Sequence, residues 1–183
     1  MTLIVPETVF RLREVVKELS EDEKVQVVIF TSGIAHLFYN HFDLTRVAEF
    51  PIGSEANAIP VWTDFVLRLS KASFVSIAHP WTYKRGRQRT IADAELDSFI
   101  DTMASRLASF DKTALAAAKA QINRATLPPD ADIRAAYTEF VASLSFPGFN
   151  ARSVSFVKLL TDLGIHDIEK RLGYYLGIAN KYL

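Results

Sequence analysis

Residues Val25–Thr31, which read Val-Gln-Val-Val-Ile-Phe-Thr, decide the fold class of this chain. The run is short, rich in β-branched side chains and almost continuously apolar, which favours a strand covered on both faces in a parallel sheet. Phe74–Ala78 is a second short apolar run of the same kind. Because two parallel strands need a crossover connection, the residues between these runs should contain a helix.

An amphipathic helix is predicted ahead of each strand. In Glu7–Leu19 the apolar residues recur at spacings of three, four and seven, which is the pattern of one buried helix face. Pro6 precedes this helix, where its missing N–H does least harm. Trp62–Leu69 shows the same kind of face ahead of the second strand. The order helix, strand, loop, helix, strand is typical of an α/β unit with right-handed crossovers.

The second half of the chain is predicted to be helical. Residues His79–Thr90 show no periodicity and are interpreted as a loop. The helices predicted beyond this loop are Ala92–Phe110, Lys112–Ala125, Asp132–Leu144 and Ala151–Leu163. The apolar stripe of the first of them is interpreted as core rather than as a subunit contact. We therefore expect an α/β core in residues 1–90 and an all-helical C-terminal region in residues 91–183.

The composition excludes several classes of protein. The chain of 183 residues holds 21 Lys and Arg against 21 Asp and Glu, and binding of nucleic acid through phosphates needs a basic surplus. The chain has no Cys, so disulfides, thiolate metal sites and a cysteine nucleophile are excluded together. Its four His lack the spacing of metal ligands, and no metal site is expected.

Neither a membrane span nor a targeting segment is predicted. The apolar runs are all shorter than the roughly 18–20 residues of a membrane helix. Met1–Arg13 lacks the apolar core of a signal peptide and the acid-poor, Arg- and Ser-rich composition of a transit peptide. We therefore expect a soluble, cytoplasmic protein without a membrane partner, and an organellar location stays open.

The run Val27–Ser32 and the stretch Phe38–Leu44 (Phe-Tyr-Asn-His-Phe-Asp-Leu) together resemble the enoyl-CoA hydratase/isomerase (crotonase) family. In that family a buried strand ends in a loop that reads Phe-x-x-x-x-Asp-Leu or Ile. The resemblance continues through both predicted helices of the first half. It resumes at Ala92–Asp97 and Ser109–Lys119, and so spans most of the chain. Each motif is moderately specific by itself, and the order of the motifs carries the resemblance.

The resemblance implies a fold of repeated ββα turns, a helical C-terminal region that forms trimers, and chemistry on acyl-CoA thioesters. Two backbone N–H groups in this family hold the thioester oxygen while negative charge builds on it. By position, the first N–H would come from Phe42, and the CoA would lie along Phe42, Asp43, Leu44 and Thr45. No resident cofactor is implied, because acyl-CoA is the substrate or ligand. The implied assembly is a homo- or hetero-trimer.

The sequence departs from the family in its middle and at its start. The family places a Gly-rich turn, which holds the second N–H donor, and two catalytic Glu after the second strand. Here no acidic residue lies between Asp64 and Asp93, and Gly86 is the single glycine of that interval. The family strands that would precede Met1–Pro6 are absent too. We therefore expect a truncated crotonase fold with impaired or absent hydratase activity, arising from an internal deletion, a splice form or an erroneous gene model.

Several polar residues have a functional and a structural interpretation. His41 and Asp43 resemble a catalytic pair, but loop structure or contact with CoA is the favoured interpretation. The basic residues would suit CoA phosphates, although solvated surface charge is the simpler interpretation. They are Lys84, Arg85, Arg87, Arg89, Lys112 and Lys119. His79, next to Pro80, is interpreted as a turn residue.

Two alternatives to an acyl-CoA enzyme remain open from the sequence. The chain would be a non-catalytic subunit if its helical region joins a full-length crotonase paralogue in a trimer. It would hardly accumulate at all if the incomplete sheet leaves strand edges exposed to aggregation.

Overall fold

The structure, a computed structural model, describes residues 4–33, 38, 42–43, 46, 49–50, 59–79, 93–164, 167–168 and 171–179. The packing divides the chain into two compact units, Thr2–Asp130 and Ala131–Leu183. The strands and the first four helices therefore belong to one unit, whereas the boundary expected from the sequence lies at residue 90.

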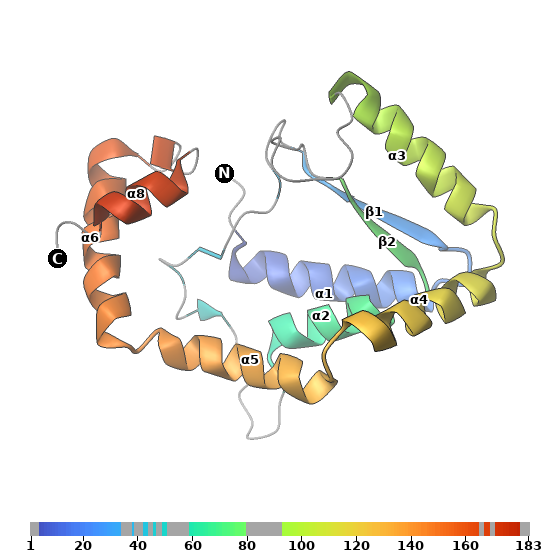
Figure 1. Cartoon of the computed structure of the whole chain (residues 1–183), viewed down its shortest axis with the longest axis horizontal. Coiled ribbons are helices and arrows are strands. Elements are labelled where there is room, and N and C mark those ends of the chain that lie inside the picture. The colour runs from blue at the N-terminus through green and yellow to red at the C-terminus, as the bar shows by residue number, and fades with distance from the viewer. Residues whose placement is uncertain are drawn as a thin grey trace. The chain divides into compact units, whose positions relative to one another are not determined.

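A parallel pair of strands forms the centre of the first unit (Figure 1). Strand β1 is Val27–Thr31 and strand β2 is Val75–His79, and they pair in register from Val27 opposite Val75 to Thr31 opposite His79. The predicted strands and their parallel direction are confirmed. The second strand runs one residue further than Ala78, so His79 ends a strand and is not the turn residue that the sequence analysis expected.

Four helices accompany these strands in the first unit. They are α1 (Pro6–Glu21), α2 (Val61–Lys71), α3 (Asp93–Ala108) and α4 (Lys112–Thr126). Each overlaps a helix that periodicity predicted. Helix α4 is rich in Ala, the best helix former, and the Asp111 carboxylate caps its first turn by accepting a hydrogen bond of 2.8 Å from the N–H of Ala114.

The helices cover the strand pair from both sides (Figure 1). On one side α1 and α2 pack against Phe74 and Val28, around the fully buried Val16. On the other side α3 places Leu96 and Ile100 against Ile77. Because successive strand residues point to opposite faces, this layering explains why β1 carries apolar residues on both faces. The α3 stripe is therefore core, as the sequence analysis favoured.

Helix α4 fixes the two connections that lead into the strands. The Lys119 Nζ donates hydrogen bonds of 2.9, 3.0 and 2.9 Å to the carbonyls of Leu69, Ala72 and Phe74, which join α2 to β2. An ammonium has three donors, so these three carbonyls use its full capacity. Lys112 binds the carbonyls of Asp22 and Glu23 at 3.0 Å each, between α1 and β1.

These contacts give Lys112 and Lys119 a structural role that the sequence analysis did not find. The C-terminal carbonyls of a helix lack partners within the helix and favour a cation. Lys119 supplies that cation to the end of α2, and the Asn123 amide adds a hydrogen bond of 2.6 Å to the carbonyl of Ser70. Burial lowers the pKa of Lys119. The charge of Lys119 therefore stabilises main-chain carbonyls of this chain.

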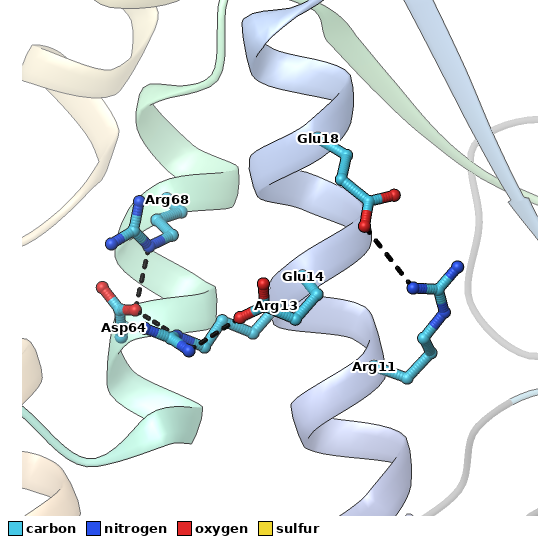
Figure 2. Close-up of polar contacts among 6 residues, drawn as sticks. All are labelled: Arg11, Arg13, Glu14, Glu18, Asp64 and Arg68. Carbon is cyan, nitrogen blue, oxygen red and sulfur yellow. Dashed lines mark hydrogen bonds and ion pairs between the residues drawn. The ribbon is translucent and has the colours of Figure 1, made fainter.

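An ion cluster joins α1 to α2 on the outer surface of the same layer (Figure 2). Asp64 accepts hydrogen bonds of 2.6 Å from Arg13 Nε and 2.8 Å from Arg68 Nε. The Asp64 side chain is only 15% exposed. Burial raises the pKa of Asp64, but the bonds from Arg68 and Arg13 outweigh it and hold the pKa below its ordinary value of 3.8. By contrast, the pair of Arg11 and Glu18 is open to solvent, where such pairs contribute little.

The second unit consists of helices with little burial. Its elements are α5 (Asp130–Ser143), which begins at the last residue of the first unit, α6 (Pro147–Leu163) and α8 (Leu172–Ala179). Helix α6 begins four residues before the predicted Ala151, because Pro147 occupies the first turn, where proline fits. Helix α6 packs with α8, but neither α5 nor α6 has a buried residue among those described.

Removal of the Lys119 ammonium should destabilise the fold. We expect Lys119→Met, which keeps most of the aliphatic stem, to lower the free energy of unfolding by about 2 kcal/mol, because three carbonyls lose a charged donor. Lys112→Met is the matched control, since its contacts are exposed, and should cost less than about 1 kcal/mol. Urea unfolding followed by circular dichroism measures both; equal losses would contradict the special role of Lys119.

Asp64 should make stability depend on pH in the acid range. Because its pKa is lowered in the folded chain, its contribution is complete above the unfolded value near 3.8 and is lost as the pH falls through the folded value. We expect Asp64→Asn to cost about 1–2 kcal/mol at pH 7, and the gap to the parent chain to close as the pH falls below 3.8. Glu18→Gln, at the exposed pair, is the control. A gap that persists undiminished in acid would refute the assignment.

Candidate functional site

The carboxyl ends of β1 and β2 form the candidate functional site. Thr31 ends β1 and His79 ends β2, and the register places them opposite each other. Ligands of open α/β sheets bind beyond the carboxyl ends of parallel strands. In this chain the resemblance-bearing stretch Phe38–Leu44 follows β1 in sequence. The motif is therefore joined in sequence to one of the two strand ends.

His79 connects this edge to α3. Its side chain is buried, with 6% exposure of the residue. The imidazole Nδ1 lies 3.4 Å from Thr31 Oγ1, and the Nε2 lies 3.4 Å from Asp97 Oδ1 on α3. His79 shares a strand face with Ile77, the face that α3 covers. The same packing that buries Ile77 therefore explains why His79 is buried and not in a solvent-exposed turn.

A second part of the site is the segment around Phe42, which is tied to the residues before α1. Phe42 forms a parallel bridge with Ile4, and the N–H of Asp43 donates a hydrogen bond of 3.0 Å to the carbonyl of Ile4. The carbonyl of Asp43 accepts from the N–H of Arg46 at 3.1 Å. Asp43 is 8% exposed. The main chain at this motif is therefore held by hydrogen bonds to the main chain.

The Phe42 side chain packs in an aromatic cluster. Its ring meets the rings of Phe50 and Trp62 edge to face, with centroids 5.1 and 4.9 Å apart. Ile4 and Val9 belong to the same apolar cluster. Such pairs stabilise beyond the area they bury. A bulky residue at this position thus has a packing role, while its backbone N–H keeps the direction that the main-chain bridge sets.

Arg46, which follows this segment, is already neutralised. Its guanidinium binds Glu49 Oε2 at 2.5 Å and Glu7 Oε1 at 2.7 Å. The hydrogen bonds that Arg46 donates to Glu49 and Glu7 raise the pKa of Arg46 above its usual range, and the same bonds lower the pKa of both carboxyls. The cation is committed to carboxylates of this chain, so we do not assign it to a ligand phosphate.

The structure brings together a part of the residues that the sequence singled out. Phe42 and Asp43 lie side by side in the bridged segment, and the Phe42 oxyanion donor stays a prediction. Residues outside the described part are Leu44, Thr45, His36, His41 and the basic run Lys84–Arg89. Thr31 and Asp97 were not identified from the sequence. The available signal was the hydroxyl of Thr31 at the end of one predicted strand and the imidazole of His79 directly after the other.

The described residues offer no metal site and no membrane span. In the described ranges, no three His, Asp or Glu side chains gather closely enough to hold an ion. No helix within those ranges is both long and apolar enough to cross a bilayer. Thr31, His79 and Asp97 instead place a hydroxyl, an imidazole and a carboxylate in series, and these are groups that take part in proton transfer.

Comparison with known proteins identifies the fold through structure alone. No family model matches the chain, and no curated protein matches it. Its structure is similar to that of a candidate enoyl-CoA hydratase from Streptomyces avermitilis, with a TM-score of 0.74 and 23% identity over 87% of this chain and 83% of the other. An enoyl-CoA hydratase from Mycobacterium smegmatis gives a TM-score of 0.53 and 16% identity over 85% and 87%.

These likenesses show that the chain shares the crotonase-like fold of both proteins. The covered shares are nearly equal on the two sides of each comparison. The solved chains are therefore close to this one in length.

Proposed function

We propose that this chain binds acyl-CoA thioesters at the carboxyl end of its strand pair and is an impaired or inactive hydratase/isomerase. The observation that carries the proposal is the crotonase-like fold combined with the bridged Phe42–Asp43 segment after β1. In the resemblance, that segment supplies an oxyanion N–H from Phe42 and a CoA-binding stretch over residues 42–45. The ligand class is thus a thioester of CoA, with no resident cofactor.

The proposed impairment follows from the sequence. Crotonase chemistry needs two N–H donors on the thioester oxygen, and loss of one donor costs about 3–4 kcal/mol of transition-state stabilisation. Hydration also needs paired carboxyls to move the α-proton and the water proton. The interval between Asp64 and Asp93 has neither an acidic residue nor a Gly-Gly pair. A truncated crotonase core of this kind would hold a thioester better than it would hydrate one.

Titration calorimetry with crotonyl-CoA tests the binding. We expect saturable binding to the full chain, no binding of free crotonate, and hydration close to the buffer rate. Phe42→Pro removes the proposed amide donor and should weaken binding about tenfold, the equivalent of one lost hydrogen bond. Phe42→Leu keeps the N–H and most of the packing, and should bind within about twofold. Equal affinities of the two variants would remove Phe42 from the site, and rapid hydration would overturn the impairment.

A second function, as a non-catalytic subunit, is favoured by the helices of the second unit. Their apolar side chains are exposed without a buried face: Phe140 39%, Phe146 60%, Val154 73% and Val157 50%. Exposed apolar patches of this kind mark protein contacts. We propose that they join other crotonase-like chains in a homo- or hetero-trimer.

Co-expression with a full-length crotonase paralogue tests the subunit proposal. We expect a mixed oligomer in size-exclusion chromatography with light scattering, because the exposed apolar residues of α6 would be covered. Val154→Asp combined with Val157→Asp should release a monomer, while Arg152→Glu, an exposed polar change on the same helix, should not. A parent chain that stays monomeric alone and with the paralogue would refute the subunit.

A further inference from the structure

We propose that Thr31, His79 and Asp97 form a hydroxyl–imidazole–carboxylate relay in which Thr31 is the nucleophile and a thioester is hydrolysed. The inference rests on the proposed function for its substrate class. It assigns to the chain a reaction whose proton transfers do not need the two Glu whose absence impairs hydration.

The order of the three groups carries the inference. The Thr31 hydroxyl lies 3.4 Å from His79 Nδ1, and the opposite ring nitrogen lies 3.4 Å from the Asp97 carboxylate, an approach that is not yet a hydrogen bond. A nucleophile, a base and an orienting acid in this sequence define the triad arrangement, which is recognised by geometry and not by fold. Both contacts are longer than those of a working relay, as is common without substrate, when catalytic hydrogen bonds tighten only on binding.

Burial divides the roles among the three residues. Thr31 is an exposed residue at the end of β1, whereas His79 is 6% exposed. The strand register fixes Thr31 opposite His79, and packing of α3 on both strands brings Asp97 to the ring. In a triad the carboxylate holds the imidazole in its working orientation. Asp97 is thus a positioning residue, and it stays 70% exposed in its side chain.

The proposed reaction balances in two steps. Thr31 Oγ attacks the thioester carbonyl carbon while His79 takes the hydroxyl proton; the C–S bond then breaks, and the departing sulfur receives that proton, which leaves an acyl ester on Thr31. Water next attacks the ester carbonyl and gives a proton to His79, which returns it to Thr31 Oγ as the C–O bond breaks. The products are a free thiol and a carboxylic acid.

The chemistry of the leaving group favours a thioester over an amide. A thiol has a pKa near 8.5, so a thiolate leaves readily without full protonation, and the relay has to supply less than in peptide cleavage. A secondary hydroxyl with one imidazole behind it is suited to this easier step. The site at the carboxyl ends of β1 and β2 is also where the proposed function places the acyl-CoA.

Thiol release from acetyl-CoA and crotonyl-CoA, followed with a thiol-reactive dye on the full chain, tests the relay. We expect Thr31→Val, which keeps the shape and removes the hydroxyl, to lower the rate at least about 100-fold, and His79→Gln to do the same. Thr31→Ser should retain activity. Ser76→Ala, a change of an exposed hydroxyl on β2, is the matched control and should leave the rate unchanged.

Two further readouts separate a relay from a structural contact. Rapid acid quenching and mass spectrometry should find the acyl group on Thr31, and Asp97→Asn should change the pH profile of the rate as well as its size. Circular dichroism reports the folding of each variant. If Thr31→Val does not fold, the relay is tested by comparing the rates of Thr31→Ser and His79→Gln and by locating the acylated residue.

The outcomes distinguish this inference from the proposed function. Binding of crotonyl-CoA without thiol release, or release that Thr31→Val and His79→Gln leave unchanged, would overturn the relay and leave the thioester site standing. A chain that does not bind acyl-CoA but cleaves p-nitrophenyl acetate in a Thr31-dependent manner would support the relay and refute the CoA site. Failure to cleave either kind of substrate would overturn the relay.

Discussion

The three hydrogen bonds of Lys119 are the contact on which the first unit depends. They close the connection between α2 and β2 at Leu69, Ala72 and Phe74, and so determine where β2 begins. A crossover strand has to enter the sheet at one register, because a slip of one residue turns every side chain to the other face. With β2 fixed at its start, Ile77 meets α3 and His79 ends beside Thr31.

The same constraint links stability to the site. The strand pair has no further strand beside it among the described residues, and two strands are marginal by themselves. Helices α1 and α2 cover one face of the pair, and α3 covers the other. As a consequence, the polar imidazole of His79 is enclosed under α3, where the hydroxyl of Thr31 and the carboxylate of Asp97 flank it. The packing that forms the core therefore also places these polar groups.

Two solved proteins described as hydratases of enoyl-CoA match most of this chain in structure, while its sequence lacks acidic residues between Asp64 and Asp93. A fold does not fix a function, since chemistry depends on the residues of the site. The strand ends present a hydroxyl and an imidazole, whereas hydration needs paired carboxyls. For this reason we propose thioester binding without efficient hydration.

The sequence by itself determined the helices, the two strands and their parallel direction. These features depend on the period of apolar residues, which is local: Glu7–Leu19 repeats with the helical spacing, and Val25–Thr31 is apolar throughout. The Phe42–Asp43 motif was also visible in the sequence, as part of the Phe-x-x-x-x-Asp-Leu pattern.

Only the tertiary structure decided what Lys119 and His79 do. Lys119 binds carbonyls about 45–50 positions away, and His79 contacts a hydroxyl 48 positions away. Contacts of this kind depend on the strand register and on the packing of α3 and α4, which no local pattern contains. From the sequence alone, a lysine on an Ala-rich helix and a histidine before a proline resemble surface residues. They become a cap and a buried imidazole because distant elements close around them.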